Sequence, residues 1–194
     1  MKTLAIIGSA LSGGAEQIID ALAGGDLFGE ILLFDNDLSA IGTEIMGAYV
    51  VDSSANILEW HRKNRFDCAV IGIGRVEERE KIFQHLSGEG VAFTNIIDKA
   101  ANIRPSVSMG AGNVILANVY LGPSVIIGDN NYIITNTHIN HHSIIGSHCY
   151  FSSGCTLAGR VHVGNKVRFD TASGSKADIK IHDETTVPAG KILV

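Results

Sequence analysis

The second half of the chain has a hydrophobic repeat with a period of six residues. Large apolar residues recur at every sixth position from Ile97 to Leu193, and Ser175 alone among these seventeen positions breaks the series. Glycine often follows the apolar residue, and a small or β-branched residue often lies four positions after it. A period of six fits neither a helix nor a two-faced strand, but it is the period of hexapeptide repeats. The pattern predicts three-sided coils of a parallel β-helix with the apolar column inside.

The chain before the repeat follows a different pattern, in which short apolar strands alternate with helical segments. Strands are expected at Thr3–Ile7, Ile31–Phe34, Ala48–Val51 and Cys68–Ile73, and helices from Ala15 to Leu22, from Ile57 to Trp60 and from Glu77 to Leu86. This alternation is typical of a doubly wound parallel sheet, which binds ligands beyond the carboxyl ends of its strands. We therefore predict an α/β, Rossmann-like domain over residues 1–95 and an all-β domain over residues 96–194.

Composition narrows the class of protein and its partners. Hydrophobic residues make up 45% and charged residues 18%, which is typical of a globular chain. The net charge of -5 supplies no basic patch, so neither nucleic acid nor an anionic membrane is an expected partner. No apolar run approaches the roughly 18 residues of a membrane helix, and the first residues do not resemble a secretion signal. We expect a cytoplasmic protein without membrane insertion. The three cysteines, Cys68, Cys149 and Cys155, are expected to be reduced apolar fillers.

Two turns of the first domain hold candidate substrate-binding residues. Gly8 and Ser9 open a glycine-rich turn after the first strand, where backbone amides at a helix start can receive an anionic group. The spacing is not that of the dinucleotide fingerprint, and these glycines can equally serve only to make a tight turn. Asp35 and Asn36 follow the second strand and could bind the hydroxyls of a nucleotide or sugar. The alternative for this pair is an ordinary polar turn.

Histidines gather in one part of the repeat. Five of the eight lie between positions 138 and 162, at His138, His141, His142, His148 and His162. His141 takes the third position of the hexad that begins at Ile139, which places it on the outside of the predicted β-helix. An exposed imidazole can remove a proton from an amine or hydroxyl near neutral pH, although a lone surface histidine is more often only solvated. The pattern makes His141 a candidate general base.

Several sequence blocks together resemble one enzyme family. These are the glycine-rich N-terminal turn, the segment from Gly72 to Ile82, INHHSIIG from Ile139 to Gly146, and LAGRVHVG from Leu157 to Gly164. Over essentially the whole chain they resemble the sialic acid O-acetyltransferase and nucleotide-amino-sugar N-acetyltransferase family. The resemblance implies a left-handed parallel β-helix, a homotrimer and acetyl-CoA as co-substrate. It also implies a nucleotide-linked amino sugar or sialic-acid-like substrate on the N-terminal domain, with acetyl transfer to its amine or hydroxyl in surface polysaccharide or glycan biosynthesis.

The resemblance also assigns roles to particular residues. His141 takes the place of the family's general base, and His142 takes the place of the carboxylate that usually orients it. The residues implied to bind the coenzyme are Tyr150, in place of a second family histidine, with Ser152, Gly154, Gly159 and Thr171. Asp170 stands where the family has a glycine on the coenzyme groove, and the stretch from Thr171 to Lys180 is expected to be irregular.

Two alternatives follow from these departures. A trimer that binds sugar nucleotides or acts as a scaffold, without transferase activity, would explain the missing carboxylate and the change at Asp170. A zinc hydratase like the gamma carbonic anhydrases is less favoured, because they use two histidines five positions apart and no close pair here has that spacing. We therefore expect no metal.

Overall fold

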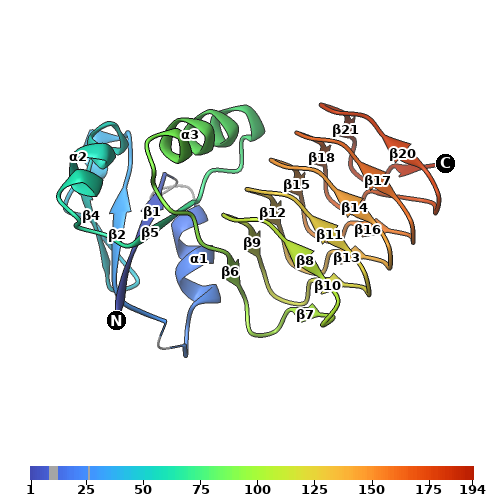
Figure 1. The fold of residues 1–194 in the computed structure, drawn as a ribbon, viewed down its shortest axis with the longest axis horizontal. Coiled ribbons are helices and arrows are strands. Elements are labelled where there is room, and N and C mark those ends of the chain that lie inside the picture. Colours follow the sequence, from blue (N-terminus) through green and yellow to red (C-terminus); the bar gives the residue numbers. More distant parts are fainter. Residues whose placement is uncertain (9–12, 26) are drawn as a thin grey trace. The chain divides into compact units, whose positions relative to one another are not determined.

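The computed structural model describes residues 1–8, 13–25 and 27–194. These residues form two compact units, Met1–Ile96 and Ile97–Val194. Figure 1 draws both units, and each is described by itself. Within the described residues no helix is both long and apolar enough to cross a membrane.

The first unit is built on one mainly parallel sheet with three α-helices. The strands are β1 (Lys2–Ile7), β2 (Phe28–Phe34), β3 (Glu44–Ile45), β4 (Ala48–Asp52) and β5 (Cys68–Ile71), and the helices are α1 (Gly14–Ala21), α2 (Ile57–Arg62) and α3 (Val76–Gly88). Short 3₁₀ turns, η1 and η2, cover Leu38–Ala40 and Ser54–Asn56. The strand order is β3-β4-β2-β1-β5, and only β3 runs antiparallel to its neighbour.

The apolar runs of the sequence become the inner strands of this sheet. The last four residues of β1 and all of β5 are buried, as expected for parallel strands covered on both faces. One core cluster joins Phe34, Phe66 and Leu86 across the sheet, α3 and the intervening loop. The predicted alternation of parallel strands and helices is therefore confirmed. The pattern did not predict β3, a two-residue strand joined to β4 by a tight turn at Met46 and Gly47.

The second unit is a stack of triangular coils made of two-residue strands. The first face holds β7 (Asn102–Ile103), β10 (Tyr120–Leu121), β13 (His138–Ile139), β16 (Thr156–Leu157), β19 (Gly174–Ser175) and β22 (Ile192–Leu193). The second holds β8 (Ser108–Met109), β11 (Ile126–Ile127), β14 (Ile144–Ile145), β17 (His162–Val163) and β20 (Lys180–Ile181). The third holds β6 (Ile96–Ile97), β9 (Val114–Ile115), β12 (Tyr132–Ile133), β15 (Tyr150–Phe151), β18 (Arg168–Phe169) and β21 (Thr186–Val187).

Each strand pairs in parallel with the strand one coil away. Tyr120 faces His138 and His138 faces Thr156, so one coil takes 18 residues, or three hexads. The ladder of parallel coils in Figure 1 is that of a parallel β-helix, which fits the predicted left-handed class of this domain.

The second residue of each strand forms the internal column that the period of six predicts. Residues from Ile115 to Val187 in this phase are buried, and Phe151 stacks on Phe169 with 4.9 Å between ring centroids. The prediction was wrong at Ile97, which is 41% exposed. Ile103 and Met109 pack against the internal column as predicted, but they are only partly buried. These residues belong to the first strand of each face, where the stack has a following coil but no preceding one.

A second set of residues with period six makes the corners. Every sixth residue from Gly112 to Gly190 has a positive φ, although only three of these residues are glycines. Asparagine tolerates this conformation, whereas Ala172, with φ 56°, carries the steric penalty of an L-residue there. The corners continue through Thr171 to Lys180, where β19 keeps the strand register with β16. The irregular stretch expected there was therefore wrong, because the small, buried Ser175 still fits the inner face in register with Leu157.

Candidate active site

His141 lies at the corner between the first and second faces, where its side chain is exposed. Ile139 anchors the preceding strand in the core, and the Asn140 side chain donates to the Leu157 carbonyl at 2.8 Å. His142 has a φ of 59° and donates its backbone N–H to the Pro123 carbonyl of the coil before, at 2.9 Å. The hexad position that buries Ile139 therefore places the His141 imidazole on the outside, and the hydrogen bonds of Asn140 and His142 hold the backbone around it.

The imidazole of His141 packs on one side against Gly159 of the next coil. A methyl group added at Gly159 would lie 2.6 Å from Cε1 of the ring and 2.7 Å from Nε2, and φ at Gly159 lies outside the left-handed region. The ring thus occupies the space that a side chain at position 159 would take, and a larger residue there would displace it. On the other side, Nδ1 of His141 lies 3.1 Å from Nδ1 of His142, and the two ring planes are 83° apart.

An ion pair lies at the same corner in the next two coils. Arg160 donates from Nε and Nη2 to the two carboxylate oxygens of Asp178 at 2.6 and 2.8 Å. Backbone hydrogen bonds join the pair to the histidine corner, from Arg160 N–H to the His141 carbonyl at 2.9 Å and from Asp178 N–H to the Gly159 carbonyl at 3.2 Å. The Arg160 hydrogen bonds hold the pKa of the Asp178 carboxyl below its usual range; desolvation opposes this shift, and the charges of Arg160 and then His141 add smaller contributions that lower it. Sequence reasoning missed both residues, although their spacing of 18 from His142 indicates one corner column.

The other residues predicted to bind the coenzyme lie elsewhere in the coil. Ser152, Gly154 and Thr171 belong to the corner between the third and first faces, where the hydroxyls of Ser152 and Thr171 are 3.0 Å apart. Tyr150 is on the third face, with the Arg168 guanidinium 4.8 Å from its ring centre. The structure thus brings Gly159 to His141 but places Ser152, Gly154, Thr171 and Tyr150 at other parts of the coil.

The histidine cluster of the sequence is likewise divided. His138 lies edge-on to Tyr120 on the first face, with ring centroids 6.0 Å apart, and His162 is exposed on the second face. His148 is buried at a different corner, where Nδ1 lies 2.9 Å from the Asn130 side-chain nitrogen. Only His141 and His142 of this cluster therefore share a corner. In the described part of the chain no three His, Cys, Asp or Glu side chains are grouped as metal ligands.

The cysteines have the predicted character. All three are free thiols in buried positions, and Cys149 and Cys155 belong to the β-helix core. Burial raises the pKa of the Cys68 and Cys155 thiols, which keeps both protonated at neutral pH.

The predicted substrate residues of the first unit lie at the carboxyl ends of β1 and β2. Gly8 has a φ of 78°, donates to the Phe34 carbonyl at 2.7 Å, and leaves no room for a Cβ beside Ile73. Asp35 accepts from the Asp37 N–H at 2.9 Å, as in a polar turn, while Asn36 is exposed. Ser9 lies outside the described residues. The geometry thus gives Gly8 a packing role and leaves Asn36 facing solvent.

The same unit contains two charged residues that sequence reasoning missed. Arg79 of α3 is 1% exposed and donates to the Ile73 carbonyl at 3.2 Å, next to the carboxyl end of β5. Asp52 ends β4 and accepts from the side chains of Trp60 at 2.9 Å and Asn56 at 2.8 Å and from the Ser53 N–H. These donors, the Trp60 indole first, lower the pKa of the Asp52 carboxyl. The partners of both residues lie within eight positions in the sequence, but the sequence alone does not show which way these side chains point.

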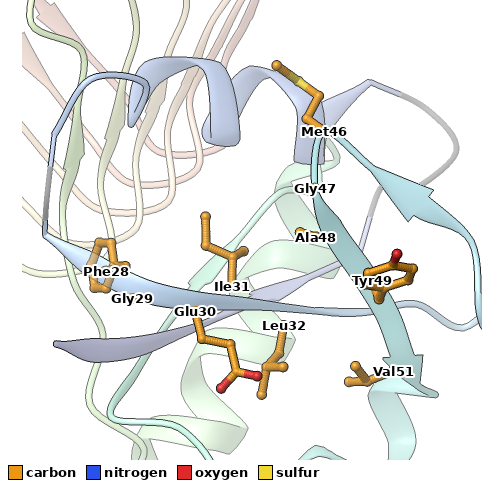
Figure 2. A pocket seen from close by; sticks show the side chains of 10 residues that line it. All are labelled: Phe28, Gly29, Glu30, Ile31, Leu32, Met46, Gly47, Ala48, Tyr49 and Val51. Carbon is orange, nitrogen blue, oxygen red and sulfur yellow. The ribbon is translucent and has the colours of Figure 1, made fainter.

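The first unit also contains a pocket between β2 and β4. Figure 2 shows its lining, which comes from the first part of β2 with the turn at Met46 and Gly47 and from β4. The pocket has a volume of about 370 Å³, and Phe28, Ile31 and Tyr49 contribute much of its apolar wall. Asp35 follows the opposite end of β2. The pocket is therefore distinct from the carboxyl edge at which the sequence predicts substrate binding.

Comparison with known proteins places the repeat in context. Residues 124–159 match the family described as bacterial transferase hexapeptide (six repeats). A histidine-to-alanine variant of the GDP-perosamine N-acetyl transferase from Caulobacter crescentus, in complex with CoA and GDP-perosamine, is 25% identical with a TM-score of 0.88, over 100% of this chain and 89% of that one. The expected resemblance is confirmed.

Other solved structures share the fold at lower identity. The acetyltransferase domain of PglB from Neisseria gonorrhoeae is 22% identical with a TM-score of 0.92, covering 100% of this chain and 92% of that one. The same domain in complex with acetyl coenzyme A is 18% identical with a TM-score of 0.79, covering 98% and 97%. No curated protein sequence matches the chain.

Proposed function

We propose that this protein transfers an acetyl group from acetyl-CoA to an amine or hydroxyl of a nucleotide-linked sugar, with His141 as the general base. The amine or hydroxyl attacks the thioester carbon, so that a bond from carbon to nitrogen or oxygen forms and the carbon–sulfur bond breaks. Nε2 of His141 takes the proton of the attacking group and returns it to the coenzyme thiolate. The proposal draws on the coenzyme and sugar complexes of the structural relatives.

The observation that carries this proposal is the geometry of the His141 ring. Its Nδ1 faces Nδ1 of His142 at 3.1 Å, and the ring packs on a glycine that has room for no side chain. An imidazole fixed on one edge by a hydrogen bond presents its other nitrogen for proton transfer. His141 as a whole is exposed at this corner, as a residue that meets a substrate must be.

The distribution of the coenzyme residues supports a site shared between copies. His141 lies at one corner of the coil, whereas the Ser152 and Thr171 pair lies at another, with the first face between them. One thioester contacts both groups most simply if the His141 corner of one copy faces the Ser152 corner of the next. This arrangement repeats around a closed ring, which agrees with the homotrimer that the family resemblance implies.

The first unit is proposed to hold the nucleotide-linked sugar in a Rossmann-like manner. Gly8, Asp35 and Asn36 lie at the carboxyl edge of its parallel strands, where ligands bind in open α/β sheets. The exposed Asn36 side chain can donate to and accept from sugar or ribose hydroxyls. Such a substrate fits a biosynthetic role in surface polysaccharides or glycans, in the cytoplasm.

The test is release of free thiol from acetyl-CoA with a panel of nucleotide-linked amino sugars and matched hydroxy sugars as acceptors. Turnover that depends on the acceptor is expected, with kcat reduced by about 10²-fold or more in His141→Ala, as when a general base is lost. His162→Ala is the matched control, because His162 is also exposed but lies on the second face. Wild-type turnover in His141→Ala would contradict the assignment.

The second candidate is a sugar-nucleotide-binding trimer without transferase activity. It is favoured by the histidine at position 142, since a neutral ring orients His141 without supplying a negative charge. Calorimetry separates the two candidates. Binding of acetyl-CoA supports the transferase, whereas no binding at millimolar coenzyme supports the scaffold.

A further inference from the structure

The contact between the two histidines determines which nitrogens carry protons. Two imidazole nitrogens 3.1 Å apart form a hydrogen bond only if one holds a hydrogen and the other a lone pair. If Nε2 of His141 is to accept the substrate proton, then Nδ1 of His141 must carry the hydrogen. Nδ1 of His142 is then the acceptor, and the His142 proton lies on Nε2. His142 thus fixes the tautomer of His141 while remaining neutral.

A neutral acceptor supplies no negative charge beside the His141 ring. When His141 takes the substrate proton its ring becomes positive, and a nearby negative charge would stabilise that state. The acidic residue of this corner column is Asp178, two coils beyond His142. The Arg160 hydrogen bond is the main cause of the lowered pKa of the Asp178 carboxyl, and His141 is the last and smallest cause. The carboxylate is thus bound by Arg160 and lies within electrostatic reach of His141.

Arg160 holds this carboxylate in position. Its guanidinium binds both carboxylate oxygens, and its backbone N–H donates to the His141 carbonyl. The Asp178 N–H donates to the carbonyl of Gly159, the residue on which the His141 ring packs. Three successive coils are therefore joined by hydrogen bonds around one imidazole. The charged and titratable groups in these three turns of the corner are His141, His142, Arg160, Lys176 and Asp178.

We propose that the two tasks of a carboxylate beside a catalytic histidine are divided in this chain: His142 orients His141, and Asp178, held by Arg160, supplies the negative charge. Both are positioning residues, and the inference rests on the acetyltransferase function proposed above. It gives the column of residues 142, 160 and 178 a role that the hexapeptide fold does not require.

The first arm of the test removes the charge and keeps the shape. Asp178→Asn is expected to lower kcat by about 10-fold, the effect of losing roughly 1.4 kcal/mol of charge stabilisation, while KM changes less than about twofold. The acidic limb of the kcat/KM profile should move to lower pH, because an imidazole without its carboxylate is less basic. Glu184→Gln is the matched control, since Glu184 is also a corner residue with positive φ, paired with Lys166 at 2.6 Å at another corner. The role of Asp178 would be overturned if Asp178→Asn left kcat and the acidic limb of the kcat/KM profile unchanged, or if Glu184→Gln lowered kcat equally.

The second arm separates orientation from charge at position 142. His142→Asn retains an acceptor and tolerates the φ of 59°, so it is expected to keep activity within about fivefold, whereas His142→Ala loses about 10²-fold. In His142→Asp the new carboxylate both orients His141 and supplies the negative charge. Adding Asp178→Asn to this variant should then change kcat less than about twofold. If Asp178→Asn costs the same in both backgrounds, the division of tasks is wrong.

A third arm does not depend on turnover. The ¹⁵N spectrum of the resting protein at neutral pH should show His141 as the Nδ1–H tautomer, and His142→Ala should abolish this preference. In His141→Gln the pKa of the Asp178 carboxyl, followed by ¹³C, should rise. An Nε2–H tautomer or an unmoved Asp178 would refute the inference even if acetyl transfer is observed. An inactive protein with both signatures would instead refute only the proposed function.

Discussion

The most informative single substitution is Gly159→Ala, because it moves the His141 ring without touching it chemically. The added methyl group would lie 2.6 Å from Cε1 and 2.7 Å from Nε2 of the imidazole. Contacts between such atoms are favourable at about 3.5–4.0 Å, so the ring must retreat by roughly 1 Å. A displacement of that size at a reacting group costs about 10²-fold in rate.

Stability should hardly change in this variant. Gly159 does not have a left-handed φ, so alanine fits its backbone, and the exposed His141 ring can move toward solvent. We expect the free energy of unfolding to change by less than about 0.5 kcal/mol while kcat falls about 10²-fold. A loss of activity without a loss of stability distinguishes a displaced base from a damaged fold.

The assay is thiol release from acetyl-CoA at saturating acceptor, with urea unfolding of the same samples. Gly88→Ala is the control, because a Cβ at Gly88 in α3 would meet no atom within 4 Å. That variant should keep full activity. Full activity in Gly159→Ala as well would refute the reasoning, since it would mean that the observed ring position is not the one used in catalysis.

Three further predictions concern stability. Ser175→Ala should raise the free energy of unfolding by about 1 kcal/mol in urea, because the buried Ser175 hydroxyl has no hydrogen-bond partner within the described part of the chain; a loss of stability would contradict this. Ala172→Gly should stabilise by about 0.5–1 kcal/mol by relieving the positive φ, which a lower urea midpoint would disprove. Asp52→Asn should destabilise by about 1 kcal/mol at pH 7. Because the folded pKa of Asp52 is lowered, its contribution is fully present above the unfolded value of 3.8 and is lost as pH falls through the folded pKa. The effect of the substitution should therefore shrink as pH falls below 3.8, and an effect that does not shrink would exclude the carboxylate as the cause.

The period of six was sufficient to predict the second unit almost completely. One phase gives the inner column, and three hexads give the coil of 18 residues. The prediction of an inward position was wrong for Ile97, which is exposed in the first strand of its face. A periodic pattern does not show where the stack of coils begins. The pattern also suggested irregularity near Ser175, although a small buried residue fits the same register.

The site was only partly predictable, for a different reason. His141 could be placed outside the coil from its position in the hexad, and the resemblance suggested its role. Its neighbours are set by stacking, which joins residues 18 apart and so brings Gly159, Arg160 and Asp178 to one corner. The 18-residue spacing was available in the sequence, but the directions of the side chains and the hydrogen bonds between coils were not.

In the first unit, the burial and hydrogen-bond partners of individual side chains decided between roles that the sequence pattern left open. Asp35 has the polar-turn hydrogen bond that was the alternative to a ligand role. The hydrogen bonds of the buried Arg79 and of Asp52 join residues within eight positions of each other, but the sequence does not show which way these side chains point. The strands of the parallel sheet were predictable because their apolar runs are continuous.

The most direct test of the central claim is the crystal structure of the protein with acetyl-CoA. Reacting atoms lie about 3–3.5 Å apart before attack, and a base lies about 3 Å from the proton it removes, so the thioester carbon should be about 4–6 Å from Nε2 of His141. The Ser152 and Thr171 corner of a second copy should line the same coenzyme. A coenzyme bound far from His141, or a protein that binds none, would contradict the account.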